Sequence, residues 1–378
     1  MLPPFETERF YAQYEFSAPY PLSVSDCETL SVRALLELAG QRLDDLGKLR
    51  LGYTESQGNP ELRQAIAETY KDVAADEVIV LATPIEGIYL TFRTLLEPGD
   101  EAIVLTPAYD ALLNLPAHLG QVKPWVLDAT DDGWALDFEA LEASLTSKTK
   151  LIVVNFPHNP TGFLPTEQEF TRLLELAQKR GIWVYSDEMY RGLEWGATPQ
   201  LPSACERFER SVVLSGLSKT HGLPGLRAGW LVVKDAELRE KILNYKLYTS
   251  ICPPAPVEYL TQVALSVEDK LVTRNRKIVR DNLQLAQPFF ERWSELFTWR
   301  PPLAGSVALV EVDVTSATEF CHILVQEAGV VLLPSAFMGF PDRYVRFGFG
   351  RRHFATGLEA FDQYLTAMQA QSDEVEVT

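Results

Sequence analysis

The distribution of apolar residues between about residues 60 and 233 constrains the fold of this chain more than any other feature. Short runs rich in Val, Ile and Leu, typical of strands, alternate there with longer segments of helical character. The expected strands cover 77–82, 101–106, 121–127, 150–156, 182–188, 211–216 and 228–233. The expected helices cover 60–73, 84–96, 109–120 (interrupted at Pro116), 137–145 and 165–181. This alternation predicts an α/β fold, in which helices sandwich a mostly parallel sheet.

A smaller α/β unit is expected to follow the large one. A long helix is expected over 270–296, and further strands are expected over 306–312 and 344–350. The chain is therefore predicted to divide into two parts. These are a large domain, 50–285, and a second unit made of the N-terminal arm, 1–49, and a small C-terminal domain, 286–378.

The composition is that of an ordinary globular enzyme and argues against several other classes of protein. The 378 residues are 46% hydrophobic and 23% charged, and the formal net charge is −18. This acidity argues against binding to nucleic acids or to anionic membranes. The first residues show no apolar signal segment, and no apolar run approaches the roughly 20 residues of a membrane span.

The four cysteines give no sign of a metal site. Cys27, Cys205, Cys252 and Cys321 are far apart, form no CxxC pair and have no nearby histidine to complete a zinc set. Buried or inert thiols in a reducing compartment are expected, and the cytoplasm is the predicted location.

Polar and aromatic residues follow at least five of the expected strands. They are Thr83, Tyr109, Asn159, Asp187 (with Tyr190 three residues later) and Lys219. In an open parallel sheet, ligands bind beyond the carboxyl ends of the strands. These side chains are therefore predicted to share one rim of the sheet and to form a site there.

Six segments resemble the motifs of one enzyme family, and they occur in the family's order. They are "YTESQGNPELRQAIA" (53–67), "TPAY" (106–109), "NFPHNPTG" (155–162), "SDEMY" (186–190), "SKTHGLPGLRAGW" (218–230) and "YVRFGF" (344–349). With them the chain resembles the class I/II aminotransferases, fold type I enzymes that use pyridoxal 5′-phosphate (PLP). The resemblance implies an amino acid and a 2-oxo acid as substrates.

The resemblance implies that four residues surround the cofactor ring. Lys219 would form the internal aldimine with PLP, which requires a neutral amine, and would then shuttle a proton. Asp187 would face the pyridine nitrogen and keep the ring protonated, so that the ring can accept electrons. Asn159 and Tyr190 would donate hydrogen bonds to the ring hydroxylate. The alternatives are a solvated loop lysine and, for Asp187, a helix N-cap.

The resemblance also implies contacts to the rest of the cofactor and to the substrate. Tyr109 would stack on the ring, and Arg227 would pair with the phosphate. Tyr53 would reach the phosphate of a neighbouring subunit, which implies a homodimer with a shared active site. Arg346 would hold the substrate α-carboxylate by two hydrogen bonds, and Asn159 would also contact the substrate.

The phosphate end departs from the family pattern after the first strand. The family generally has Gly-Ala or Gly-Thr there, whereas this chain has "LATPIEGI". Pro84 has no N–H to donate, so the hydroxyl of Thr83 and the amides of Ile85 and Glu86 are the expected donors.

A second departure lies three residues before the lysine. The family tends to have a phosphate-binding serine at this position, where this chain has Gly216. Ser215 and Ser218 are the expected replacements.

The sequence leaves the reaction and the substrate open. An aminotransferase is the first interpretation, and another PLP reaction on the same fold (β-lyase, decarboxylase, racemase or cyclase) is the second. A non-catalytic PLP sensor is disfavoured, because such proteins usually carry a basic DNA-binding segment. The N-terminal arm is expected to line part of the substrate pocket, with Tyr14 and Tyr20 as candidates that could equally be packing residues.

Overall fold

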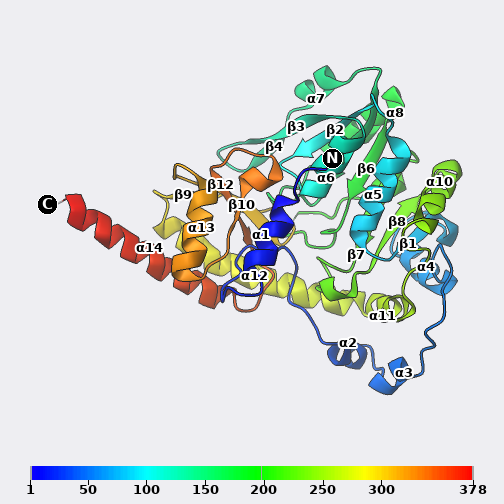
Figure 1. Cartoon of the computed structure of the whole chain (residues 1–378), viewed down its shortest axis with the longest axis horizontal. Coiled ribbons are helices and arrows are strands. Elements are labelled where there is room, and N and C mark those ends of the chain that lie inside the picture. The colour runs from blue at the N-terminus through cyan, green and yellow to red at the C-terminus, as the bar shows by residue number, and fades with distance from the viewer. Residues whose placement is uncertain (1, 197, 377–378) are drawn as a thin grey trace.

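The structure of the chain is a computed structural model that describes residues 2–196 and 198–376 (Figure 1). Its centre is an eight-stranded sheet in the order β1-β8-β7-β6-β5-β2-β3-β4. The strands are β1 (Val78–Leu81), β2 (Glu101–Thr106), β3 (Gln121–Ala129), β4 (Trp134–Leu136), β5 (Thr149–Asn155), β6 (Trp183–Asp187), β7 (Ser211–Gly216) and β8 (Gly229–Val233). The five strands from β7 to β3 run parallel, while β8 and β4 are antiparallel to their neighbours. The predicted α/β fold with a mostly parallel sheet is confirmed.

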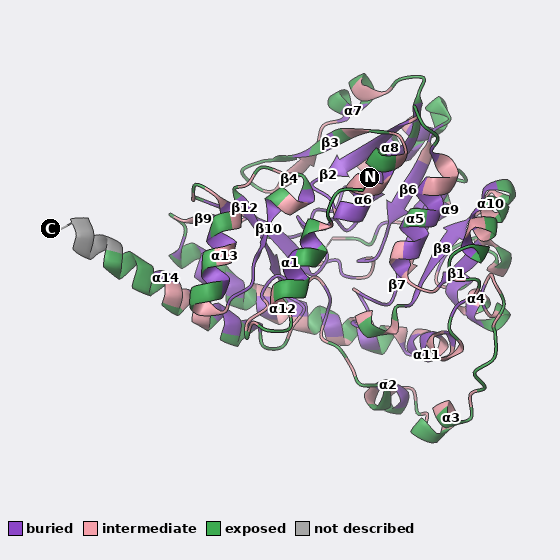
Figure 2. Cartoon of the chain, in the orientation of Figure 1, coloured by how far each residue is buried: buried purple, intermediate pink, exposed green. Residues whose placement is uncertain are grey.

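Helices cover both faces of this sheet, so most of its strands are buried, whereas much of β3 and the edge strand β4 are exposed or half-buried (Figure 2). Side chains alternate between the faces of a strand. In β1, Ile79 and Leu81 accordingly join one apolar core and Val78 and Val80 the other. The covering helices are α4 (Pro60–Ala67), α5 (Pro84–Leu95), α6 (Asp110–Leu119), α7 (Phe138–Ser144), α8 (Glu167–Arg180), α9 (Ala204–Arg207), α10 (Ala236–Leu247) and α11 (Ala255–Leu265).

A four-stranded antiparallel sheet forms the second unit, in the order β11-β12-β10-β9. Its strands are β9 (Phe297–Thr298), β10 (Val307–Val312), β11 (Leu333–Pro334) and β12 (Tyr344–Gly348), and its helices are α13 (Ala317–Ala328) and α14 (Phe354–Glu376). The long helix α12 (Glu268–Arg292) leads from the large sheet to this unit (Figure 1). The domain boundary expected at residue 285 falls inside α12, and the division stays a prediction.

The N-terminal arm first contacts the large unit, where the Glu6 amide donates to Asp110 Oδ1 at 3.1 Å, and then crosses the small unit before it returns to the large one. It contains α1 (Glu6–Tyr14), α2 (Val32–Leu38) and α3 (Leu43–Gly47). Between α1 and α2 the arm runs against β12, where the Gly348 amide donates to the Leu22 carbonyl at 2.7 Å. A Cβ at position 348 would overlap the backbone of Val24, so a glycine there permits this close approach. The contact carries residues 23–26 to the rim of the large sheet.

Among the described residues, no helix is both long enough and apolar enough to cross a membrane.

Candidate active site

Lys219 lies just beyond β7 and is the centre of the site. Its amine donates a hydrogen bond to the Ser25 hydroxyl of the N-terminal arm at 2.9 Å. Burial lowers the pKa of this amine, and the nearby Arg346 cation adds to the effect, while Asp26 opposes it. Both effects favour the neutral amine that a nucleophile requires. The alternative of a solvated loop lysine does not match this half-buried, hydrogen-bonded side chain.

Asp187 is the last residue of β6, and the residue is 9% exposed. Burial raises its pKa to about 7, although a hydrogen bond from the Met189 amide (3.1 Å) and the charge of Lys219 oppose the rise. A turn rather than a helix follows at residues 189–192, so the alternative role as a helix N-cap is not realised. A buried carboxylate of this kind is suited to a cationic ring nitrogen, which would restore its ionised form.

Two buried hydroxyls near Lys219 have no hydrogen-bond partner within the described structure. The Tyr190 hydroxyl, on a side chain only 3% exposed, lies near Ser25 without the geometry of a hydrogen bond. The hydroxyl of Ser218, which is 4% exposed, is also unpaired. Because buried polar groups are normally hydrogen-bonded, these two hydroxyls indicate positions where the polar atoms of a ligand would be accommodated.

Arg346 brings the small unit into the site. This residue of β12 is 2% exposed, and it donates to Asn159 Oδ1 at 2.9 Å, to the Tyr11 hydroxyl at 2.7 Å and to the Ser23 carbonyl at 2.9 Å. All three acceptors are neutral, and among the described residues Arg346 has no carboxylate partner. A buried guanidinium with only neutral partners is suited to an anion, and a carboxylate matches its planar fork.

Thr83 and Arg227 meet at the phosphate end predicted from the sequence. Arg227 donates to the Thr83 hydroxyl and to the Pro224 carbonyl, both at 2.8 Å, and its guanidinium is otherwise exposed. Thr83 directly precedes α5, and Ile85 lies in the first turn of that helix. The Glu86 amide donates to the Thr83 carbonyl at 3.1 Å. The expectation that this amide is free is therefore wrong, because the first turn of α5 closes on Thr83.

The structure explains why residue 216 is a glycine. A Cβ at this position would lie 2.5 Å from the Ala228 carbonyl oxygen, because β8 pairs closely with β7 here. The serine typical of the family is therefore excluded. The expected replacements are Ser215, half-buried in β7, and Ser218, whose unpaired hydroxyl makes it the better candidate.

Tyr109 lies at the same rim, directly before α6. Tyr53 lies away from this rim. The Tyr109 hydroxyl donates to Glu8 Oε1 at 2.7 Å, and its ring centroid is 5.2 Å from that of Phe5. Tyr53 is 92% exposed, and within the described ranges its side chain forms no hydrogen bond or ring contact.

The N-terminal arm supplies the site residues that the sequence did not reveal, namely Tyr11, Ser23 and Ser25. Tyr14 and Tyr20, the two tyrosines of the arm that the sequence offered as candidates for the substrate pocket, are packing residues. Tyr14 contacts His322 Nδ1 at 3.2 Å, and Tyr20 pairs with Val330. The contacts of Tyr11, Ser23 and Ser25 depend on where the arm crosses β12, and no local motif in the arm indicates them.

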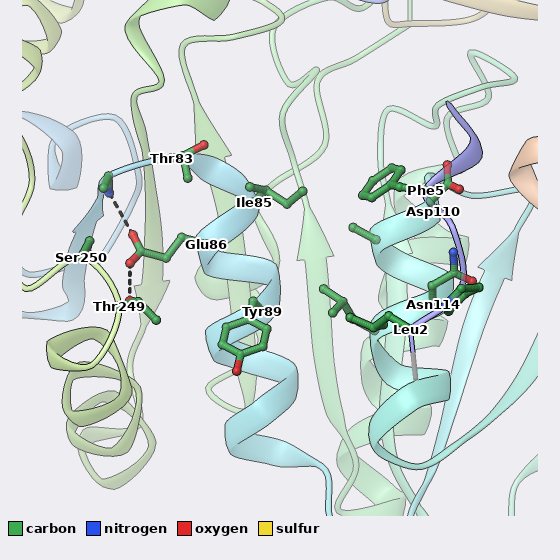
Figure 3. A pocket seen from close by; sticks show the side chains of 14 residues that line it. Leu2, Phe5, Thr83, Ile85, Glu86, Tyr89, Asp110, Asn114, Thr249 and Ser250 are labelled. Atoms are coloured by element: carbon green, nitrogen blue, oxygen red, sulfur yellow. Dashed lines mark hydrogen bonds between the residues drawn. The ribbon is translucent and has the colours of Figure 1, made fainter. Parts of the chain in front are cut away.

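A cavity of about 490 Å³ adjoins the phosphate end (Figure 3). Side chains of α5 and α6 form its walls, and Leu2, Pro3 and Phe5 border it. Its lining is mostly apolar, although Glu86 holds one side through hydrogen bonds from the Ala82 amide (3.0 Å) and the Thr249 hydroxyl (2.6 Å). The cavity therefore extends the candidate site toward the outer surface of α5 and α6.

Comparisons with known proteins agree with this geometry. The profile of the family "Aminotransferase class I and II" matches residues 20–356. A capreomycidine synthase from Streptomyces vinaceus is 30% identical over 325 residues, which cover 85% of this chain and 82% of that protein.

Two solved structures are also similar over almost the whole chain. A PLP-dependent aminotransferase from Streptococcus suis has a TM-score of 0.90 at 29% identity, and a PLP-dependent cyclase, OrfR, has a TM-score of 0.89 at 28% identity. In both cases 97% of this chain and 98% of the other are covered. The match to the family profile over most of the chain, together with the rim of residues around Lys219, shows that this protein belongs to the PLP-dependent class I and II aminotransferases.

Proposed function

We propose that this aminotransferase moves an amino group between an α-amino acid and a 2-oxo acid, with Lys219, Asp187 and Tyr190 as its catalytic residues. The observation that supports this most strongly is that two basic side chains with different properties, Lys219 and Arg346, lie in the same site. Lys219 has an amine whose pKa is lowered by burial, and Arg346 is a buried guanidinium without a carboxylate partner. The first is suited to a carbonyl and the second to an α-carboxylate.

The residues present fit PLP. Lys219 would hold its aldehyde, Asp187 its ring nitrogen, Tyr190 and Asn159 its ring oxygen, and Tyr109 its ring face. Its phosphate would be bound by Thr83, Ile85, Ser215, Ser218 and Arg227. When bound, PLP supplies an electron sink for the bond that breaks at the substrate Cα.

The residues of the protein have separate roles in this reaction. Arg346 and Asn159 orient the amino acid through its carboxylate, so that Cα faces Lys219. The Lys219 amine would accept the proton from the substrate Cα and then donate it to the cofactor carbon. The Asp187 carboxylate would stabilise positive charge at the ring nitrogen.

Borohydride reduction of the PLP-loaded protein, followed by peptide mapping, tests the central assignment. The label is expected on Lys219 alone, and Lys219→Ala should lose turnover while still binding PLP without a covalent link. A label on another lysine would overturn the assignment.

A different PLP reaction is the second candidate. Two of the similar proteins are named a synthase and a cyclase rather than an aminotransferase. Release of ammonia, or of a cyclised product, during turnover without a 2-oxo acid would favour this candidate.

A homodimer with a shared site and a cytoplasmic location complete the proposal. Tyr53 and Leu51 are 92% and 83% exposed, which suits residues that contact a second copy of the chain. The four free cysteines, three of them buried, suit a reducing compartment.

A further inference from the structure

One face of α1 carries two carboxylates toward the site. Glu8, Tyr11 and Glu15 are spaced by three and four residues, and Glu15 continues the helical backbone beyond Tyr14, so the three lie on one side of the helix. Tyr11 fixes the direction of this side, because its hydroxyl accepts a hydrogen bond from Arg346 at 2.7 Å. In Figure 1, α1 lies between the small unit and the rim of the large sheet.

Because Tyr11 contacts Arg346, the carboxylates on its side of α1 face the region between Arg346 and Lys219. Glu8 accepts the hydrogen bond of the Tyr109 hydroxyl at 2.7 Å, which places it at the rim. Lys219 interacts electrostatically with Glu8 and with Glu15. An amino acid held at Arg346 by its carboxylate would therefore extend its side chain along this face of α1.

The negative charge of this face is not balanced by the protein. Asp26 pairs with Arg351 at 2.7 Å, whereas neither Glu8 nor Glu15 forms an ion pair within the described ranges. Burial raises the pKa of Glu15, and the carboxylates of Asp26 and Glu8 raise it further. In the proposed function Lys219 is committed to the cofactor and Arg346 to the α-carboxylate, so both glutamates lack a cation.

Two buried groups indicate that a ligand site adjoins this face, in which Glu8 itself is exposed and Glu15 is half-buried. Arg346 is 2% exposed and has only neutral acceptors. The Tyr190 hydroxyl, on a side chain 3% exposed and near Arg346, has no hydrogen-bond partner in the described structure. Buried groups in this state indicate a ligand between α1 and Lys219.

We propose that the amino donor carries a positively charged side chain, an amino or guanidino group, which Glu8 and Glu15 bind. This inference rests on the proposed transamination, and it names the class of amino acid that the site accepts. Dicarboxylic amino acids would meet like charge at α1 and would be rejected.

The test compares matched amino acids in half-reactions of the PLP-loaded enzyme, with no 2-oxo acid present. L-Lysine and L-norleucine differ only by the terminal amino group, L-arginine tests a guanidino group, and L-glutamate tests the opposite charge. Absorbance of the bound cofactor reports binding through the saturable shift on mixing, and conversion through the slower change that follows. We expect kcat/KM for lysine or arginine to exceed that for norleucine at least about tenfold, which is the order of one charge-assisted hydrogen bond.

Three variants link this preference to α1. Glu8→Gln retains an acceptor for Tyr109 and removes the charge, and Glu15→Gln removes the second charge. Each should raise KM for the cationic amino acid about tenfold, leave norleucine nearly unchanged and affect kcat little. Glu6→Gln, at an exposed position of the same helix, is the matched control and should change nothing.

The outcomes separate this inference from the proposed function. Equal reaction of lysine and norleucine, or equal losses for both in the glutamine variants, would overturn the inference and leave transamination intact. Saturable binding of cationic amino acids that requires Glu8 and Glu15, without conversion, would support the inference and contradict transamination. Failure of every cationic amino acid to bind would overturn the inference whatever other amino acids do.

Discussion

Arg346 is the residue whose environment most narrowly limits the kind of ligand that the site can bind. A guanidinium that is 2% exposed and surrounded by neutral acceptors gains most from a carboxylate. Arg346→Ala should raise KM for the amino donor by about 30-fold, which corresponds to about 2 kcal/mol for a lost charged hydrogen bond. The absorbance of the resting, PLP-loaded enzyme should change little.

Steady-state kinetics with the preferred donor would measure this effect. Arg343→Ala is a suitable control, because the Arg343 side chain is largely exposed and lies just before the same strand. An unchanged KM in Arg346→Ala would place the carboxylate site elsewhere.

Asp187 makes the stability of the PLP-free protein depend on pH. Its folded-state pKa of about 7 lies above the ordinary value of 3.8 for an aspartate, so folding takes up a proton between these limits. The stabilisation from the protonated group is complete below about pH 4 and is lost as pH rises through about 7. At about 1.4 kcal/mol per pKa unit, the loss is at most about 4 kcal/mol.

Urea unfolding of the PLP-free protein and of Asp187→Asn, at pH values from about 4 to 8, measures this loss. Asparagine retains the acceptor for the Met189 amide and does not titrate. The free energy of unfolding of the unmodified protein should fall relative to the variant as pH rises. A constant difference would show that the pKa of Asp187 is not raised.

At the residue scale, the sequence indicates the half of the site that local motifs form. Lys219, Asp187 and Asn159 follow strands at fixed positions in short motifs, and the structure places them at one rim. Tyr11 and Ser25 reach the site only because the arm crosses β12. Such a contact between distant segments leaves no periodicity or motif in either one, so the sequence alone does not predict it.

At the scale of single elements, the pairing of β7 with β8 controls the phosphate end. A Cβ added at Gly216 would lie 2.5 Å from the Ala228 carbonyl oxygen. Because this oxygen belongs to the backbone of the paired strand, moving it away costs free energy. Gly216→Ser, although it introduces the residue typical of the family, should therefore destabilise the protein by about 1–3 kcal/mol.

Thermal unfolding with and without PLP would test this effect. Gly225→Ser is the matched control, because a Cβ there would meet nothing within 4 Å. A Gly216→Ser protein as stable as the control, with tighter PLP binding, would show that the strands can separate to admit the serine.

The strand pattern predicts most of the large sheet but not all directions within it. β8 runs antiparallel between β1 and β7, and the sequence does not reveal this, because a strand buried on both faces has the same apolar run in either direction. The helix α6 also continues through Pro116 to Leu119, without the interruption expected at Pro116. Proline removes one backbone hydrogen bond, and the buried packing of Ala111 and Leu112 holds the helix in place.

At the scale of the whole molecule, the proposed homodimer predicts complementation between two inactive proteins. Tyr53 would act on the site of the other subunit, whereas Lys219 acts on its own. Mixed dimers of Tyr53→Ala and Lys219→Ala should contain one site that carries both mutations and one intact site. In a randomly mixed population about half of the dimers are mixed, and each mixed dimer has one intact site of two. Activity should therefore recover to about a quarter of normal.

Activity after joint refolding of the two variants, with the fraction of mixed dimers measured through two different affinity tags, tests this prediction. Proven mixed dimers without activity would count against a shared site.

The central claim concerns the whole enzyme, and one spectroscopic experiment tests it most directly. The PLP-loaded protein is mixed with single amino acids and no 2-oxo acid, and the cofactor absorbance is followed before and after a 2-oxo acid is added. Transamination predicts that a suitable donor converts the cofactor from its aldehyde to its amine form, that the 2-oxo acid reverses the change, and that Lys219→Ala shows neither step at the normal rate. A cofactor that is never converted while ammonia, carbon dioxide or a thiol is released would contradict the claim.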